Sequence, residues 1–187
     1  MENHSAPENQ TTRRILLTAC ATALAVATVH LALVAFTPGA ALAGDQHIRW
    51  SDVRGIVQAQ AVVGTGSGAV TGGGSPWSTT GGHVEVNLDH GSINFEIRGL
   101  VLAASNSIGT RDSVTVVKGT LVCDTNGSLT GSSALIDTSL VTLDEQGDAH
   151  FNGVVGAFPP ECSEPDIAFL VRTAGGAWIA FGAVRRP

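Results

Sequence analysis

The two cysteines in the second half of the chain carry its most reactive side chains. Cys162 stands in "PPECSEP", residues 159–165, and Cys123 ends the apolar run "SVTVVKGTLVC". A cysteine in either place can act as a nucleophile, as a metal ligand or as half of a disulfide. In an exported chain an even pair is most simply a disulfide, and closing a loop of about 40 residues would stabilise the fold by roughly 4 kcal/mol. We therefore predict a Cys123–Cys162 disulfide, with free thiols and a metal or catalytic role as alternatives.

Histidine and acidic side chains are the next group that could do chemistry. His83 and Glu85 lie two positions apart in an expected strand and so share one face, and His90 falls at the expected tip of the following turn. These three residues are the candidates for a surface metal site. The sequence contains neither HExxH nor a spaced Cys/His cluster, so we predict that no metal is bound.

The common catalytic motifs are missing from the sequence. No serine stands in a G-x-S-x-G elbow, Thr115 fills the serine position of S-x-x-K in "TVVK", and no G-x-G-x-x-G loop occurs. We predict no catalytic residue and no cofactor. An enzyme would need dispersed groups gathered by the fold into one concave pocket. The groups in question are His83, Glu85, His90, His150 and the loop carboxylates.

Trp77 is the candidate binding residue. It stands inside "GTGSGAVTGGGSPWSTTGG", residues 64–82, which has too few apolar side chains to offset the entropy of ordering it. We expect this Gly/Ser/Thr-rich segment to be a flexible loop or a loosely held connection between strands. Trp77 then either folds back onto the sheet or presents an aromatic surface to a ligand such as a sugar ring or a partner protein.

The N-terminal part has the three zones of a secretory signal peptide of bacterial type. A polar leader with two arginines is followed by an apolar stretch at residues 15–36 and then by the small residues of "ALAGD". We predict that residues 1–43 form a hydrophobic signal helix that is removed before Gly44, which places the protein in the periplasm or outside the cell. "TRRILL", residues 12–17, resembles a twin-arginine signal, so both that route and the general secretory route stay open.

The mature chain, residues 44–187, has the size of one domain and is acidic. Removing the leader takes away two acidic and two basic residues, so the formal net charge stays at -6. The basic residues are scattered apart from Arg185 and Arg186, whereas nucleic acid binding needs a clustered basic face. We therefore exclude nucleic acid as a partner and expect an unknown extracellular or envelope ligand.

Strand patterns dominate the mature chain. In residues 83–99 apolar and polar residues alternate on both sides of the turn "DHGS", which predicts a hairpin with one buried face. Further runs rich in β-branched and aromatic residues predict strands at 55–63, 113–123, 133–138, 139–144, 149–156, 166–173 and 178–184. The pattern predicts an all-β fold, a single antiparallel β-sandwich or barrel of about eight strands.

These features favour an exported, non-catalytic β-sandwich module with a binding or envelope-associated structural role, and its ligand stays open. One alternative is a hydrolase or metal-dependent enzyme outside the cytoplasm, with a site assembled from dispersed His, Asp and Glu side chains. The other is the same domain held at a membrane by residues 15–36, which are long enough to span a bilayer if they are not removed.

Overall fold

The structure, a computed structural model, describes residues 46–163 and 165–186. The expected signal helix, residues 1–43, and the alternative anchor, residues 15–36, lie outside the described residues. Within the described residues the fold is all-β, as predicted, and no α-helix occurs. No helix in this part of the chain has the length and apolar character that a membrane span requires.

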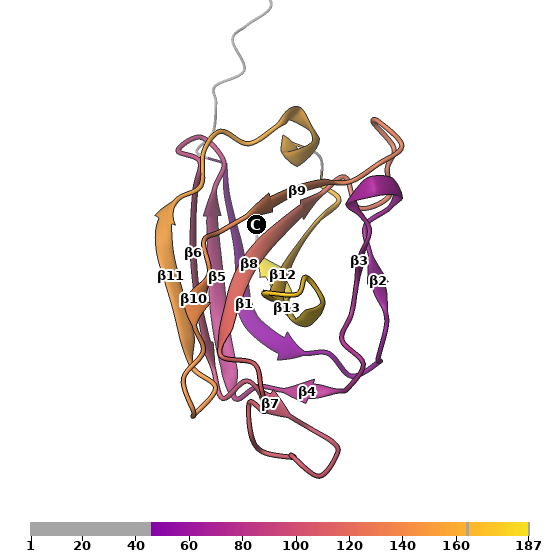
Figure 1. Ribbon diagram of the computed structural model, residues 1–187. Coiled ribbons are helices and arrows are strands. Elements are labelled where there is room, and N and C mark those ends of the chain that lie inside the picture. Colours follow the sequence, from indigo (N-terminus) through magenta and orange to yellow (C-terminus); the bar gives the residue numbers. More distant parts are fainter. Residues whose placement is uncertain (1–45, 164, 187) are drawn as a thin grey trace, which may run out of the picture. The chain divides into compact units, whose positions relative to one another are not determined.

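One antiparallel sheet of nine strands forms the body of the domain (Figure 1). Eight strands follow the order β10-β8-β12-β13-β1-β5-β6-β11, and β9 pairs with the same edge of β8 as β10 does. The nine strands are β1 (His47–Gly55), β5 (Gly81–Asn87), β6 (Ser92–Arg98), β8 (Val116–Cys123), β9 (Ala134–Asp137), β10 (Val141–Thr142), β11 (Ala149–Val154), β12 (Ile167–Thr173) and β13 (Trp178–Arg186).

Shorter elements lie in the connections between these strands. Two pairs of two-residue strands form small ladders of their own, β2 with β3 and β4 with β7. The short strands and the two 3₁₀ turns are β2 (Val62–Val63), η1 (Gly66–Gly68), β3 (Val70–Thr71), β4 (Trp77–Ser78), β7 (Val101–Leu102) and η2 (Pro160–Ser163).

The main sheet curls into a half-barrel (Figure 1). β10 and β11 stand at opposite ends of the strand order, yet they are consecutive in the sequence. A short turn joins them, in which Asp144 N–H donates to Asp148 O at 3.0 Å. The two ends of the sheet therefore approach each other at this turn. The predicted antiparallel all-β domain is confirmed, and its sheet is one curled half-barrel of nine strands instead of the two stacked layers of a sandwich.

Aromatic side chains fill the inside of the curl. Phe95 of β6 and Phe169 of β12 are fully buried, with ring centroids 5.6 Å apart, and Trp50 of β1 packs on Phe169 at 6.1 Å. These rings fit because the strands that face them carry glycine. A Cβ on Gly119 would lie 2.7 Å from the Phe169 ring, and a Cβ on Gly182 would lie 2.7 Å from the Trp50 ring. A larger residue at either position would force the rings outward and widen the curl.

The predicted hairpin is confirmed, and one predicted strand is wrong. β5 and β6 pair over their whole length, and Gly91 takes the left-handed φ of 62° in the turn between them. Residues 55–63 do not continue as a strand, because Ile56 donates its N–H to Ile179 O at 2.9 Å and Gln60 turns the chain with a left-handed φ of 58°. The strand at this place, β1, lies immediately before that run.

The Gly/Ser/Thr-rich segment contributes most of an arm, residues 61–73, which approaches Val122 of β8, Arg172 of β12 and Trp178 of β13. At its base, Gly73 N–H donates to Trp178 O at 2.8 Å, and Trp178 Nε1 donates to Ala61 O at 2.9 Å. Near its tip, Thr65 N–H donates to the Ser133 hydroxyl at 2.9 Å. Hydrogen bonds at both ends thus hold the arm on the sheet, and the flexibility expected from its composition stays a prediction.

The predicted disulfide is confirmed. Cys123 at the end of β8 and Cys162 in η2 are bonded, with Cα atoms 4.7 Å apart, and both residues are buried. The bond joins positions 39 residues apart in the sequence and ties the loop that carries η2 across one end of the half-barrel (Figure 1). It therefore holds that end of the core closed.

Removing this bond should weaken the fold strongly. We expect Cys123→Ala combined with Cys162→Ala to lower the free energy of unfolding by about 4 kcal/mol, because a loop of about 40 residues is freed in the unfolded chain. Urea unfolding of the oxidised protein and of the double variant measures the difference, and the reduced wild type should match the variant. A double variant as stable as the oxidised protein would contradict this role.

Candidate functional site

A groove of about 630 Å³ lies over the outer face of β5, β6 and β11. The polar side chains of this face point away from the aromatic core, because successive strand residues alternate between the two sides of a sheet. The register places Glu96 of β6 opposite His83 on one side and opposite His150 on the other. These three side chains therefore form a row across three strands.

Two carboxylates from the turn between β10 and β11 stand at the rim of the groove. Asp144 Oδ1 accepts the N–H groups of Gln146 at 3.0 Å and of Asp148 at 2.8 Å. Asp148 Oδ1 accepts the N–H of Gly99 at 2.7 Å. Asp144 thus fixes the backbone of the turn and Asp148 ties the turn to Gly99 after β6, which explains why acidic residues stand there in the sequence.

The ion pairs in the groove have long N···O distances, and their side chains are exposed to solvent. Glu96 lies 3.5 Å from Arg98 Nε and 3.9 Å from His83 Nδ1, and the side chains of His83 and Glu96 are 45% and 43% exposed. Ion pairs as exposed as these contribute little to stability. The row can offer hydrogen bonds to a polar ligand, but these contacts do not place its carboxyl and imidazole groups in the distinct, shielded environments that acid–base catalysis uses.

The groove meets the condition for an assembled site, which is that two or more of the candidate groups share one pocket. His83 and His150 share it with the carboxylates of Asp144 and Asp148. Sequence reasoning did not single out Glu96, which lies between the two histidines only because β6 pairs with both β5 and β11. The positions of these groups agree with the enzyme alternative. Their exposure to solvent does not.

The other two candidate metal ligands lie elsewhere. Glu85 pairs with Arg49 of β1 at 3.4 Å, and His90, in the turn between β5 and β6, donates its N–H to Asn87 Oδ1 at 2.9 Å. In residues 46–163 and 165–186 no three His, Cys, Asp or Glu side chains are grouped closely enough to hold a metal ion. A metal-binding role for His83, Glu85 and His90 stays a prediction.

Trp77 is buried in the core, with 6% of its surface exposed. The backbone N–H of Trp77 donates to Ile56 O at 2.8 Å, and Leu102 lies opposite Trp77 in the pairing of β4 with β7. The chain passes close by at Gly55, where a Cβ would lie 2.1 Å from the Trp77 carbonyl oxygen. Trp77 thus folds back onto the sheet, which is one of the two expected positions, and its role in ligand binding stays a prediction.

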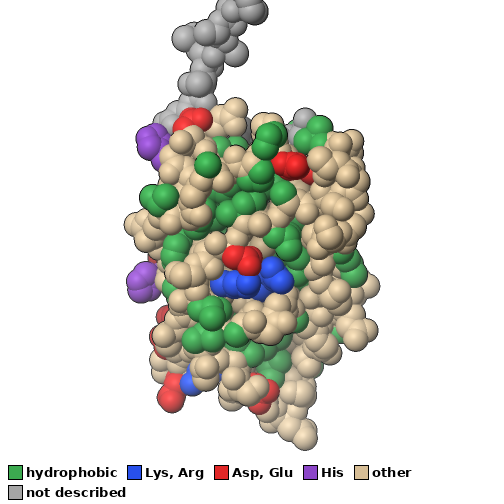
Figure 2. Space-filling view, turned by 45° about the horizontal axis from the view of Figure 1, so that its top comes forward, with side chains coloured by type: hydrophobic (Ala, Val, Ile, Leu, Met, Phe, Trp, Pro, Cys, Tyr) green, Lys and Arg blue, Asp and Glu red, His purple; other side chains and the backbone are tan. Residues whose placement is uncertain are grey.

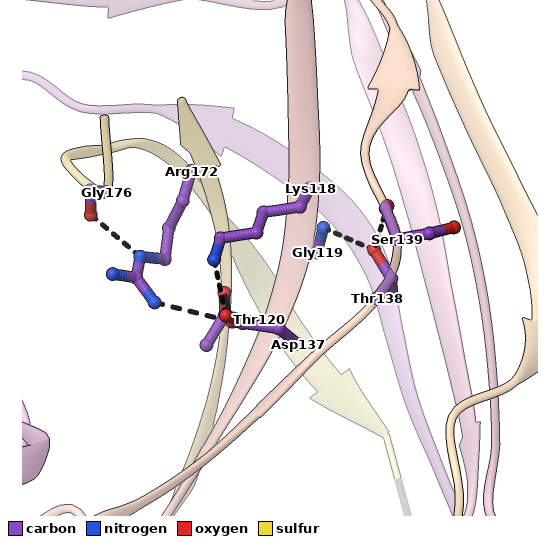
Figure 3. A network of polar contacts seen from close by, with 8 residues as sticks. All are labelled: Lys118, Gly119, Thr120, Asp137, Thr138, Ser139, Arg172 and Gly176. Atoms are coloured by element: carbon purple, nitrogen blue, oxygen red, sulfur yellow. Dashed lines mark hydrogen bonds and ion pairs between the residues drawn. The ribbon is translucent and has the colours of Figure 1, made fainter. Parts of the chain in front are cut away.

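A second polar site, termed the Asp137 cluster, consists of Lys118, Thr120, Asp137 and Arg172 on the outer side of β8, β9 and β12 (Figure 3). Asp137 Oδ1 accepts hydrogen bonds from Thr120 Oγ1 at 2.6 Å and from Arg172 Nη1 at 3.3 Å. Its other oxygen, Oδ2, pairs with the Lys118 ammonium group. The cluster therefore joins the edge strand β9 to two strands of the sheet.

The partners of Asp137 keep its carboxyl group charged. Partial burial raises the pKa of Asp137, but hydrogen bonds from Lys118 and Thr120 and the positive charges of Lys118 and Arg172 lower it by more. The pKa of the carboxyl consequently lies below its ordinary value. Asp124, fully buried at the end of β8, also has a lowered pKa, because hydrogen bonds from the N–H groups of Leu129 and Ser128 outweigh the effect of burial.

Sequence reasoning did not identify the Asp137 cluster. The alternation in "TVVKGTLV" places Lys118 on the outer face of a strand, which suits a solvated lysine equally well. The cluster exists only because the sheet order sets β9 and β12 on either side of β8. Such long-range pairing leaves no local pattern in the sequence.

Comparisons of this chain with protein-family models, with curated proteins and with solved structures found no match.

The Asp137 cluster should make stability depend on pH. Because folding lowers the pKa of Asp137, its charged form stabilises the fold above the ordinary carboxyl pKa, and this contribution is lost as pH falls through the lower folded value. We expect Asp137→Asn to reduce the free energy of unfolding by about 1 kcal/mol at pH 7, allowing for solvent screening, and by almost nothing at pH 2.

Urea unfolding of both proteins between pH 2 and pH 7 measures this difference. Glu145→Gln is the matched control, because Glu145 is exposed and forms no hydrogen bond in the described structure. A difference between wild type and Asp137→Asn that stays constant over the whole pH range would show that the cluster's charge contributes nothing.

Proposed function

We propose that the protein is an exported, non-catalytic β module with a binding or envelope-associated structural role. The observation that carries this proposal is the buried Cys123–Cys162 disulfide in an all-β domain. Disulfides form and persist in oxidising compartments such as the periplasm and the cell exterior. The leader predicted at residues 1–43 supplies the corresponding export route. A binding role also accords with the exposed polar groups on the outer strand faces.

Export can be tested directly on the protein as cells produce it. We expect the periplasmic or secreted fraction to contain a species that begins near Gly44, with both remaining cysteines oxidised, because the leader is removed after transfer. Intact mass spectrometry with and without reductant measures both properties at once. A full-length chain with free thiols, recovered from the cytosol, would overturn the proposal, and a full-length chain recovered from the membrane would support the anchored alternative.

A second candidate function is a hydrolase that acts outside the cytoplasm. The row of His83, Glu96 and His150 favours it, because an imidazole next to a carboxylate can activate water for attack on an ester or phosphate. The groove leaves the row accessible to a large substrate. The long distance between Glu96 and His83 and the high exposure of both side chains argue that any hydrolysis at this site is slow.

Activity measurements separate the two candidates. For a hydrolase, a panel of nitrophenyl esters, phosphates and glycosides should show turnover that His83→Ala or His150→Ala lowers by about 100-fold, the usual scale for loss of a general base. His90→Ala is the matched control, since His90 lies outside the groove lining. Turnover that survives both changes, or no turnover above buffer, would count against the second candidate.

A further inference from the structure

The Asp137 cluster contains more positive than negative charge. Lys118 and Arg172 both pair with Asp137, which is the only carboxylate that contacts either of them in the described part of the chain. Two cations thus share one carboxylate, which leaves the cluster with an excess of one positive charge. The whole sequence is acidic, with a net charge of -6, and Lys118 is its only lysine, so this local excess runs against the overall composition.

The two cations stand where a sheet would normally avoid them. Arg172 is directly opposite Lys118 in the pairing of β12 with β8. Like charges at directly opposed positions destabilise a sheet. Their side chains are only 14% and 20% exposed, so water screens them less than it screens ordinary surface cations. Asp137 offsets only part of this repulsion.

The guanidinium group of Arg172 is fixed in place and has donors to spare. Its Nε donates to Gly176 O at 2.7 Å and its Nη1 donates to Asp137, whereas Nη2 has no hydrogen-bond partner in the described structure (Figure 3). A Cβ on Gly176 would lie 3.1 Å from Nη2, so the glycine leaves room beside this nitrogen. Arg172 also lines a depression of about 370 Å³ between residues 69–72 and 175–177.

Apolar side chains lie near the cluster. Figure 2 shows basic side chains beside an acidic one in the middle of a molecular face, with hydrophobic side chains among polar groups and backbone around them. Leu135, 37% exposed, lies two positions before Asp137 on β9 and so points to the same side, and Leu140, 51% exposed, follows shortly after. An excess of positive charge next to apolar surface binds an anion more strongly than the same charge surrounded by water.

We propose that Lys118 and Arg172 form the binding site for an oxyanion group, a carboxylate or a sulfate, carried by the ligand of this module. The proposal rests on the proposed binding role and specifies the chemistry of the ligand. The anion accepts a hydrogen bond from the Lys118 ammonium, which uses one of its three donors on Asp137, and the positive charge of the neighbouring Arg172 attracts it as well. Asp137 orients the two cations and limits the affinity by repelling the anion.

The test compares two substitutions in the Asp137 cluster that should change the affinity for an oxyanion in opposite directions. Lys118→Met should lower the affinity for an oxyanion by about tenfold, because a charge-assisted hydrogen bond is lost. Asp137→Asn should raise it by about fivefold, because a repelling charge is removed. If the cluster were only structural, neither substitution would produce this pair of opposite changes. Arg98→Gln is the matched control, since Arg98 is an exposed arginine paired with Glu96 on β6, which does not pair with β8, β9 or β12.

The probes are sodium acetate and sodium sulfate at constant ionic strength, followed through backbone amide shifts of the exported protein. Shifts centred on residues 118–120, 137 and 172 are expected. Calorimetry with polygalacturonate, dextran sulfate and neutral dextran then distinguishes a carboxylate polymer from a sulfate polymer as the source. Binding of either charged polymer, or of the small anions alone, supports the site.

Three results would overturn the proposal. The first is no localised amide shift with either anion, and the second is an equal loss of oxyanion affinity in Lys118→Met and Asp137→Asn. The third is a loss of affinity in Arg98→Gln as large as that in Lys118→Met. A folded Asp137→Asn protein suffices for the decision if Lys118→Met does not fold. Failure of this site leaves the proposed export untouched, since mass spectrometry tests export without any ligand. Conversely, a chain that is not exported can still bind the anion, so the two tests fail independently.

Discussion

The curl of the sheet depends on close contact between aromatic rings and glycine. Phe95 and Phe169 meet inside the half-barrel because Gly119 presents no side chain to them, and Trp50 has the same relation to Gly182. A flat sheet of nine strands would leave these rings exposed, whereas the curl buries them completely. With the inner face closed in this way, polar chemistry is confined to the outer face, where both the groove and the Asp137 cluster lie.

The disulfide and the arm complete the enclosure from different directions. The bond between Cys123 and Cys162 holds a loop over one end of the core, and the arm approaches side chains of β8, β12 and β13. Val70 of the arm is buried in the core and Val63 packs against it, and backbone hydrogen bonds and close glycine contacts hold the rest of the arm. The Asp137 cluster lies on the same side of β8, since Lys118 and Thr120 share that side with Val122, which the arm approaches.

Local patterns predicted the parts of this fold that depend on neighbouring residues. The hairpin of β5 and β6 could be predicted because strict alternation and a glycine turn lie within 17 residues, and the disulfide because only two cysteines follow residue 43. The strand predicted at 55–63 is wrong because Ala and Val also occur in irregular segments, and because nothing in the sequence around Gln60 indicates its left-handed φ. The row of His83, Glu96 and His150 and the pairing of Lys118 with Arg172 depend on sheet order, which composition does not encode locally.

The position of the first and last strands has a consequence for how the domain is made. β1 lies in the middle of the sheet, between β5 and β13, and β13 is the last of the strands in sequence order. A ribosome or a translocation pore releases residues in order, so β1 and β13 can pair only after the strands between them have emerged. The centre of the sheet therefore closes late, and loss of β13 would remove a central strand and not a peripheral one.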